Sequence, residues 1–289
     1  MGLLSRFFGK NKVVERSAEP DLVYIPNEDE RMNWAMEKAG LTLWYFENSL
    51  KSPSAGQEYF SIKVMIEDEG QVEHIWLTAP DFDEEGNLFG EVGNEPVQVK
   101  NVKLGQKIGV MRTLISDWMI VEHGRLIGGY TIRAIREGIP ETERTSFDES
   151  IGLLIDVGID HFKADFDTPE GAILSLEQAY QEKDIDKALA CKDFYQEAKL
   201  MLSSLDFQME EEMIISTSEA LAISFVSYIE KEGMPDFSNI NRAFTNREKI
   251  NDNYWIITEV CTYPDGGNSV QRLQTYKTAQ GWRVLGVAG

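Results

Sequence analysis

The chain has 289 residues, with 28 lysines and arginines against 49 aspartates and glutamates, which gives a formal net charge of −21. So acidic a chain repels phosphate backbones and anionic lipids, which argues against nucleic acid as its main partner. A basic protein or peptide would be steered toward it, although acidity also serves solubility alone. The length exceeds what one hydrophobic core usually reaches and predicts two domains.

The cysteine pattern indicates a reduced, cytoplasmic protein. Cys191 and Cys261 lie far apart, with neither a CxxC pair nor a Cys/His cluster. A disulfide scaffold and a zinc site of ordinary spacing are therefore excluded, and both thiols are expected to be buried. The acidic residues 81–86 alternate like a calcium loop, but the twelfth position is Val92 where that loop needs a glutamate. We expect an ordinary hairpin turn there and no metal site.

Residues 1–26 form a polar leader with an apolar beginning. Four large apolar side chains fall on one helical face among basic residues, namely Leu3, Leu4, Phe7 and Phe8. This pattern suits either contact with a membrane surface or a loosely docked segment. A long apolar core and a small-residue cleavage site are both missing, so a signal peptide is not predicted. The sequence has no run of eighteen apolar residues, so no transmembrane segment is expected.

The elements of residues 27–137 predict an α+β domain. Asn27 can cap a helix that Gly40 would end, and residues 41–50 suggest a second short helix. Alternation of apolar and polar residues then predicts a mostly antiparallel sheet. Its strands are expected at residues 59–66, 72–79, 88–92, 107–114, 118–122 and 125–133.

Residues 138–166 are expected to be a linker, because residues 138–150 are polar and non-periodic. Residues 151–159 are apolar, and would be either a helical anchor of the linker or the first element of the next domain. A second domain, residues 167–289, opens with Thr168 as a helix cap and Pro169 in the first helical position. Asp184 can start a second helix, which runs on through Met201. A third helix is expected at 218–232, followed by strands at 243–249, 254–263, 269–278 and 282–287. The fold class is therefore α+β, with two domains that each pack helices on a mostly antiparallel sheet.

His74 and Asp117 are the first candidates for chemistry. A histidine beside a carboxylate can be a general base, but Glu73 and His74 are neighbours in a strand and face opposite sides. His74 could still meet Asp117 across the sheet. Because no nucleophile signature accompanies the pair, a histidine that stabilises the fold is the simpler expectation.

The surrounding stretch also has structural explanations. Asp117 can cap backbone amides at a strand junction, and Trp118 is large enough to anchor a core. Gly124 suits a hairpin turn, and Gly128–Gly129 suggests a bulge or a close approach of another segment.

In the second domain, Trp255 and Glu259 share one face of a predicted strand. A carboxylate among aromatic residues can line a pocket with a raised pKa, or it can simply stand at the open mouth of a cone. Tyr195 and Tyr228 are further candidates for lining such a pocket. The sequence has neither GxGxxG between strand and helix nor a phosphate loop, so no cofactor is predicted.

Residues 30–137 carry a set of short motifs in a specific order. They are FSIKV at 60–64, EHIW at 73–76, FG at 89–90, NEP at 94–96, Gly105 and ISDW at 115–118. By these motifs the segment resembles the YegJ-like family, domain of unknown function 2314. The resemblance implies a fold and no catalytic chemistry, with the signature residues Glu73, His74, Trp76, Asn94, Pro96, Asp117, Trp118 and Gly129.

The order of elements in residues 167–289 is similar to that of the nuclear transport factor two-like superfamily. Helices come first, followed by long strands, PDG at 264–266 and GWRV at 281–284. The resemblance implies a cone-like curved sheet around the N-terminal helices, and the terminal strands look most similar to the immunity-protein branch. An isomerase of this superfamily would need a pocket aspartate base with a tyrosine and aspartate oxyanion pair, which no motif here places.

These observations favour a non-catalytic cytosolic protein-binding module. The resemblance to immunity proteins implies neutralisation of a bacterial toxin by direct binding, and the charge favours a basic toxin. The alternative is a small-molecule-binding protein or enzyme that uses the cone of the second domain. A pocket lined by Glu259 with Tyr195 or Tyr228 would favour the alternative, whereas a cone filled by Trp255, Phe225 and Met201 would count against it.

Overall fold

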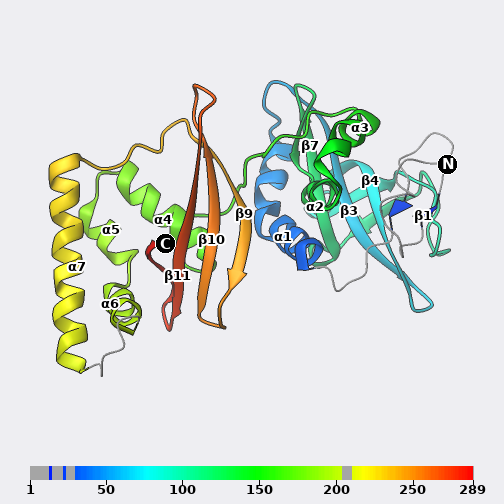
Figure 1. The fold of residues 1–289 in the computed structure, drawn as a ribbon. Coiled ribbons are helices and arrows are strands. Elements are labelled where there is room, and N and C mark those ends of the chain that lie inside the picture. The colour runs from blue at the N-terminus through cyan, green and yellow to red at the C-terminus, as the bar shows by residue number, and fades with distance from the viewer. Residues whose placement is uncertain (1–12, 15–21, 24–29, 204–209, 289) are drawn as a thin grey trace. The chain divides into compact units, whose positions relative to one another are not determined.

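The computed structural model describes residues 13–14, 22–23, 30–203 and 210–288. Its contacts divide the chain into an N-terminal unit, Met1–Gly158, and a C-terminal unit, Ile159–Gly289 (Figure 1). Each unit has its own antiparallel sheet and helices, which confirms the α+β class with two sheet-bearing regions. The apolar side chains of the leader and the expected cap Asn27 lie outside the described residues.

The N-terminal unit is a six-stranded antiparallel sheet with helix α1 (Glu30–Lys51) packed against one face. Ile62, Ile75 and Ile120 come from three neighbouring strands and are fully buried beneath that helix. The strand order is β6-β5-β4-β3-β7-β8, and a further short pair, β1 (Val13–Val14) and β2 (Leu22–Val23), is antiparallel. The six strands are β3 (Gln57–Asp68), β4 (Gln71–Phe82), β5 (Leu88–Val92), β6 (Lys107–Val110), β7 (Ile115–Glu122) and β8 (Arg125–Gly128).

Helix α1 is continuous, so the expected end at Gly40 and the separate helix at 41–50 are wrong. The buried residues Ala39, Thr42 and Phe46 follow one another at helical spacing on both sides of the glycine. Burial of that apolar face outweighs the roughly 1 kcal/mol that a mid-helix glycine costs. The Trp118 indole then donates to the Ala39 carbonyl and to the Thr42 hydroxyl, both at 3.1 Å, which ties the middle of the helix to β7.

Residues 125–133 do not form one strand as expected. β8 ends at Gly128, and α2 (Tyr130–Gly138) begins after Gly129, which has φ 60°. The alternating apolar residues of this stretch resemble a strand, but the left-handed glycines turn the chain. Residues 93–106, between β5 and β6, form a loop, and a short 3₁₀ turn (Arg112–Leu114) precedes β7.

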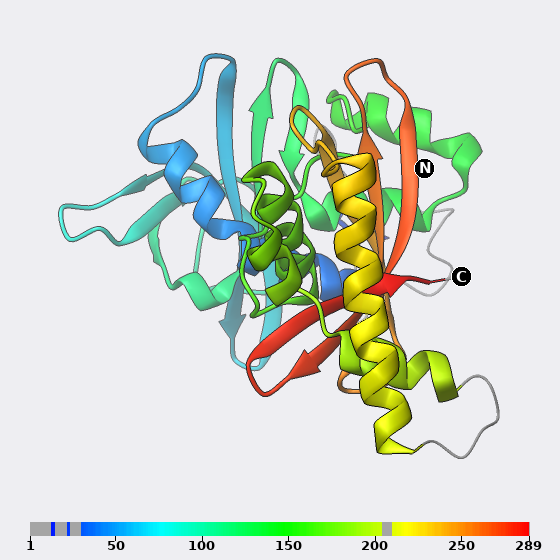
Figure 2. The ribbon, with the colours of Figure 1, turned by 90° about the vertical axis from the view of Figure 1, so that its left-hand side faces the viewer.

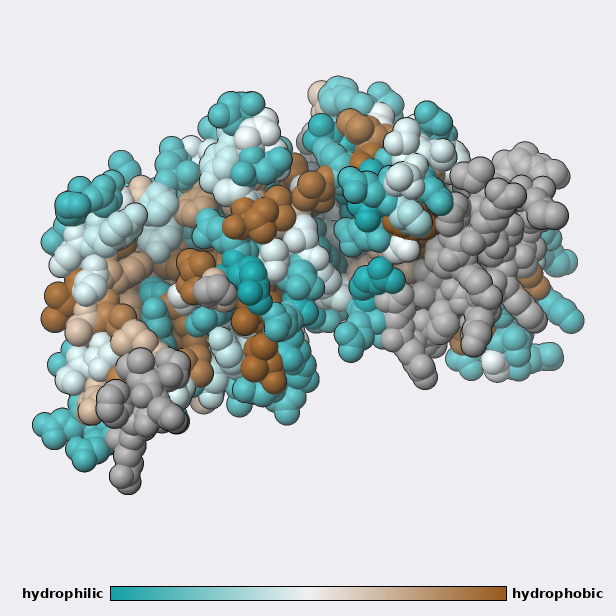
Figure 3. Space-filling model, viewed as in Figure 1, coloured by the Kyte–Doolittle hydropathy of each residue, from teal (hydrophilic) through white to brown (hydrophobic). Residues whose placement is uncertain are grey.

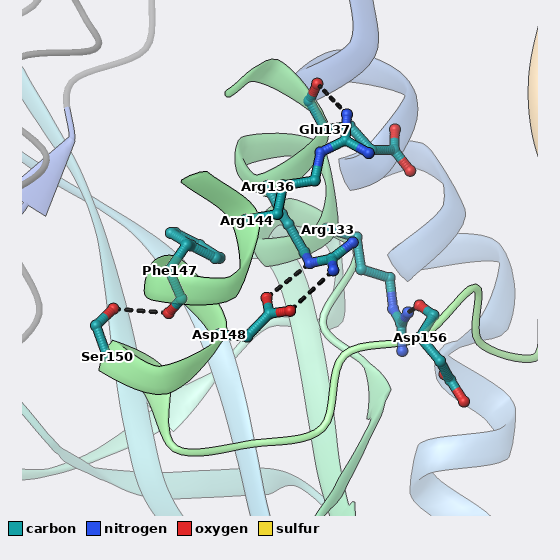
Figure 4. A network of polar contacts seen from close by, with 8 residues as sticks. All are labelled: Arg133, Arg136, Glu137, Arg144, Phe147, Asp148, Ser150 and Asp156. Carbon is teal, nitrogen blue, oxygen red and sulfur yellow. Dashed lines mark hydrogen bonds and ion pairs between the residues drawn. The ribbon is translucent and has the colours of Figure 1, made fainter. Parts of the chain in front are cut away.

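Much of the expected linker belongs to the two units. Residues 141–151 form α3 (Glu141–Ile151), whose Asp148 receives two hydrogen bonds from Arg136 of α2, at 2.6 and 2.8 Å (Figure 4). Arg133 of α2 donates to the carbonyl oxygen of Asp156. Past the division at Gly158, the amide of Asp160 donates to the Arg242 carbonyl at 2.9 Å. These polar contacts, together with the buried side chains of Ile139, Phe147 and Ile155, hold the segment in place.

The C-terminal unit has four helices followed by four antiparallel strands in the order β12-β11-β10-β9. Thr168 caps α4 by accepting from the Gly171 amide at 2.9 Å, and Asp184 caps α5 in the same way, as expected. The single helix expected up to Met201 is instead two, because residues 191–193 hydrogen-bond to Val284 of β12. The elements are α4 (Pro169–Gln181), α5 (Ile185–Ala190), α6 (Phe194–Ser203), α7 (Glu211–Glu232), β9 (Asn241–Lys249), β10 (Tyr254–Thr262), β11 (Asn268–Thr278) and β12 (Gly281–Val287).

Helix α7 lies on the outside of this unit, in front of the other elements in Figure 2. It begins seven residues earlier than expected, at Glu211, and two of its residues, Ile214 and Ile229, are buried. Among the described residues it is the one helix that is long and apolar enough to cross a membrane, judged by length and composition alone, and little of it is buried in the unit. The sequence predicted no transmembrane segment because it has no uninterrupted run of eighteen apolar residues. Helix α7 does not form such a run, because serines stand among its apolar residues.

Candidate functional site

Three strands of the N-terminal unit bring several signature residues together on one region of the sheet. Lys63 of β3 pairs in register with Trp76 of β4 on one side and with Asp117 of β7 on the other. Directly opposed residues of antiparallel strands share a face, so these three side chains lie on the same side of the sheet. The Lys63 ammonium is 5.7 Å from the centre of the Trp76 ring and 3.4 Å from the Thr131 hydroxyl.

Asp117 is fully buried and holds the start of α2. Its carboxylate accepts from the amides of Trp118, Tyr130 and Thr131 at 2.8, 3.0 and 2.8 Å, and from the Thr131 hydroxyl at 2.6 Å. Asp117 therefore caps the N-terminus of α2, although it lies well before the helix in the sequence. Burial raises the pKa of Asp117, against the opposing effect of the Thr131 hydrogen bond and the Lys63 charge.

His74 meets Ser116 rather than Asp117. Its Nδ1 lies 2.8 Å from the Ser116 hydroxyl, which also donates to the Lys63 carbonyl at 3.2 Å. Burial, with the nearby Lys63 charge, lowers the pKa of His74 to about 4, so the ring is neutral at pH 7. A neutral histidine on a serine is the pairing that a nucleophilic serine needs. Ser116, however, is 6% exposed and bonded to the strand beside it, so the pair serves to join β4, β3 and β7.

Glu73 fixes the loop that contains two more signature residues. Its buried carboxylate accepts from the amides of Val97, Gln98 and Val99 at distances between 2.8 and 3.3 Å. Asn94 and Pro96 lie immediately before these amides in the loop that follows β5. Successive amides that donate to one carboxylate fix this stretch of the loop, which is not part of a strand.

Trp118 and the double glycine complete the signature around the core. Trp118 is fully buried, with ring-centre distances of 5.8 Å to Phe46 and 5.7 Å to Tyr130. Gly128 has φ 69°, and a Cβ at that position would lie 2.5 Å from the Trp118 ring. At Gly129 a Cβ would approach the Leu126 side chain to 2.7 Å. The expected close approach is therefore that of the tryptophan and a leucine of the same unit.

The four residues expected to line a pocket in the C-terminal unit are spread apart. Tyr195 is 38% exposed and donates to the Glu211 carboxylate at 2.9 Å, which links α6 to the start of α7. Tyr228 is 62% exposed on α7. Trp255 packs on Trp282 with ring centres 5.0 Å apart, and Glu259 is buried. They do not enclose a common cavity in the part of the chain that the structure describes.

Sequence reasoning missed the partners of Glu259. Glu177 of α4 and Glu259 of β10 both contact Arg242 of β9, whose guanidinium is 2.6 Å from the Glu177 carboxylate and 3.5 Å from that of Glu259. Burial, and then the neighbouring Glu259 carboxylate, raise the pKa of Glu177 to about 9 in spite of Arg242. A second buried pair, Glu170 with Arg247 at 3.3 Å, also joins α4 to β9. The described residues hold no group of three or more His, Cys, Asp and Glu side chains arranged for a metal ion.

The outward face of α7 is the largest exposed apolar feature of the helices in this unit. Ile223 is 67% exposed, Ile215 44% and Met213 40%. Helical spacing places exposed small and apolar residues along the middle of this face, namely Ser216, Ala220, Ile223 and Ser227. A parallel row of exposed carboxylates, Glu212, Glu219 and Glu230, lies beside them. Figure 3 shows hydrophobic residues at the surface along α7, on its left-hand side.

Comparisons with known proteins show what the N-terminal unit is similar to. Residues 29–155 match the model of a family described as "Uncharacterized protein conserved in bacteria (DUF2314)". The chain is 37% identical over 84 residues to the uncharacterised protein YegJ of Escherichia coli K12, which covers 29% of this chain and 54% of that protein. No solved structure matches. The resemblance to the YegJ-like family is confirmed, and the matched region extends to residue 155, through α3.

A second relative reaches further along the chain. A putative ankyrin repeat protein of Neisseria meningitidis serogroup B is 28% identical over 199 residues, covering 66% of this chain and 74% of that protein. The covered share of this chain is larger than the whole N-terminal unit, so the similarity continues into the C-terminal unit. For that unit, the resemblance to the nuclear transport factor two-like superfamily stays a prediction.

Proposed function

We propose that the chain is a non-catalytic protein-binding module of the bacterial cytoplasm that neutralises a basic toxin by direct binding. The observation that carries the proposal is the outward face of α7, in which exposed small and apolar residues lie beside a row of carboxylates. Exposed contiguous apolar surface rimmed by charge is typical of interaction sites. We place the partner on this face.

The charge of the face favours a basic partner. The exposed acidic residues of α7 outnumber its one lysine, Lys231, and the chain as a whole carries −21. Such a field speeds encounter with a positive surface, whereas the exposed side chain of Ile223 supplies apolar area that is dehydrated on binding. The name of the Neisseria relative, an ankyrin repeat protein, agrees with this proposal, because ankyrin repeats present surfaces for binding.

The alternative, a small-molecule enzyme in the cone, has less support. Glu259 is 1% exposed and paired with Arg242, while Tyr195 and Tyr228 stand on the surface. Phe225 packs on Phe194 with ring centres 5.7 Å apart, although Met201 is 47% exposed instead of filling the cone. The side chains that an active site would need are thus separated or already paired.

The test uses the full chain and the proteins encoded beside it. We expect one of these proteins to be basic, to bind in isothermal titration calorimetry with an affinity that falls as salt rises, and to be toxic to cells unless this chain is co-expressed. Ile223→Asp should abolish binding and protection. Val270→Asp is the matched control, because Val270 is 66% exposed on β11 of the same unit and should leave both unchanged.

Two results would count against the proposal. One is that no neighbouring protein binds, and the other is that Ile223→Asp binds and protects like the unmodified chain. A membrane role for α7 would show as binding to phosphatidylcholine or phosphatidylglycerol vesicles that Ile223→Asp removes, and it would replace the proposal.

A further inference from the structure

The C-terminal unit contains an open cavity of about 590 Å³ that none of the features above uses. It lies between the start of α6 and the turn that joins β11 to β12, and Lys192, Asp193, Ala279 and Arg283 are among the residues that line it. This volume is in the range that small organic ligands occupy. The charges around it decide which kind of ligand fits.

Arg283 is held rigidly at the wall of this cavity. Its Nη1 donates to the carbonyl oxygens of Trp282 and Gln280, at 2.8 and 3.3 Å. The guanidinium also stacks on Phe166, 4.1 Å from the ring centre. Stacking and the two backbone contacts fix the plane of the group, so little freedom would be lost when its remaining edge binds a ligand.

That remaining edge has no carboxylate among the residues that the structure describes. The other arginines of this unit, Arg242, Arg247 and Arg272, each form an ion pair with a glutamate. Arg283 instead meets backbone oxygens and a ring, which leave the Nε and Nη2 side without an acceptor in the described part of the chain. In a chain with 49 acidic residues, an arginine without a carboxylate is a position where an external anion can replace one.

A second cation and a helix start lie on the same lining. The Lys192 side chain is 9% exposed, with its ammonium 3.4 Å from Glu197. The acidic residue of the lining, Asp193, accepts from the Gln196 amide at 2.9 Å and so caps the ten-residue helix α6. Its charge is thereby directed to the helix start, where negative charge is favoured.

We propose that this cavity binds a small anionic ligand through a carboxylate or phosphate group, held edge-on by Nε and Nη2 of Arg283. Planar guanidinium edges match the paired oxygens of either group. The ligand would enter past Ala279, which is exposed at the turn. This proposal does not depend on the binding face of α7.

The experiment titrates the full chain with inorganic phosphate and, separately, with citrate, at constant ionic strength in a calorimeter. Saturable binding of at least one anion is expected, and the stronger of the two indicates whether a phosphate or a carboxylate is preferred. Arg283→Gln should weaken it by roughly tenfold or more, because a charge-assisted contact is lost. Arg272→Gln, at an exposed arginine paired with Glu248, is the matched control and should leave it unchanged.

A second variant separates binding from folding. Ala279→Glu keeps every contact of Arg283 and adds a carboxylate at the cavity mouth, so it should also weaken binding if circular dichroism shows a native chain. If Arg283→Gln does not fold, the anion affinity of Ala279→Glu serves as the test of the proposal. The proposal is overturned if neither anion binds saturably, or if a folded variant binds as tightly as the unmodified chain.

Discussion

In the N-terminal unit, the buried carboxylates of Glu73 and Asp117 are held by backbone amides, whereas in the C-terminal unit those of Glu177 and Glu259 are held by one arginine. The amides belong to a loop and to the start of a helix, so each carboxylate fixes irregular backbone. The arginine belongs to a strand and faces a helix, so the second arrangement joins α4 to the sheet.

The difference has an electrostatic consequence. Amides supply partial charges in fixed positions, and at Asp117 the Lys63 charge adds to them, although burial still raises the pKa of that carboxyl. At Glu177, burial first and the neighbouring Glu259 carboxylate second raise the pKa to about 9, because one guanidinium cannot balance two buried carboxylates. The C-terminal unit is thus predicted to be sensitive to loss of the Arg242 charge and to alkaline pH.

The largest effect is expected from Arg242→Met. It leaves Glu177 and Glu259 buried without their cation, which should cost the C-terminal unit about 3–5 kcal/mol. Hydrogen exchange measured by mass spectrometry reports each unit separately and should show faster exchange in α4 and β9 but not in β7. Adding Glu177→Gln and Glu259→Gln should restore most of the loss. If the triple variant is as unstable as the single one, lost packing of the arginine, rather than charge, explains the effect.

The second prediction concerns pH. Because the folded pKa of Glu177, about 9, exceeds the ordinary value of 4.5, the folded state keeps a proton that the unfolded state loses. The free energy of unfolding of the C-terminal unit should therefore fall as pH rises from 4.5 to about 9, by about 1 kcal/mol for each pH unit. The folded pKa values of His74 and His161 are about 4, so their contributions vary below pH 6.5. Between pH 6.5 and 9, Glu177→Gln should flatten the dependence, and an unchanged slope would contradict the assignment.

The same comparison explains which parts of the fold the sequence could predict. Strands β3, β4 and β10 were predictable because one face of each is buried, which produces alternation. Helix α2 was not, because its first residues have strand-like alternation and the carboxylate that caps it, Asp117, lies thirteen residues before Tyr130. Helix α3 buries only Phe147 and is joined to α2 by the ion pair of Arg136 with Asp148, so it has too little apolar period to be predicted.

The candidate sites follow the same rule. The capping role of Asp117 and the core position of Trp118 could be anticipated, since each follows from residue type at a strand junction. The group of Glu177, Arg242 and Glu259 could not, because its members lie on three elements far apart in sequence. The sequence pointed to Glu259 only, and its contact with Arg242 arises from the tertiary packing. The exposure of α7 was equally hidden, since serines and isoleucines on a helix do not indicate which side meets solvent.

A third prediction tests the amide-held carboxylate. Asp117→Asn replaces one acceptor oxygen by a donor that faces the amides of Tyr130 and Thr131, and should destabilise the N-terminal unit by about 2–3 kcal/mol. Chemical denaturation measures the loss. Asp83→Asn is the control, because the Asp83 carboxylate also accepts amides, from Glu85 and Asn87, but in an exposed turn. Its cost should be clearly smaller than that of Asp117→Asn. Equal losses would mean that burial of the capping carboxylate adds nothing.

The smallest effect is a change in the titration of His74. Burial is the larger cause of its pKa of about 4, and the Lys63 charge is the second. Lys63→Met removes that charge, so the pKa should rise but stay below the ordinary 6.5, as followed by NMR of the imidazole protons. Ser116→Ala is the matched control, because it removes the hydrogen bond to His74 and leaves both burial and charge in place. If Lys63→Met leaves the pKa unchanged, the charge of Lys63 does not reach the ring, and burial alone keeps His74 neutral.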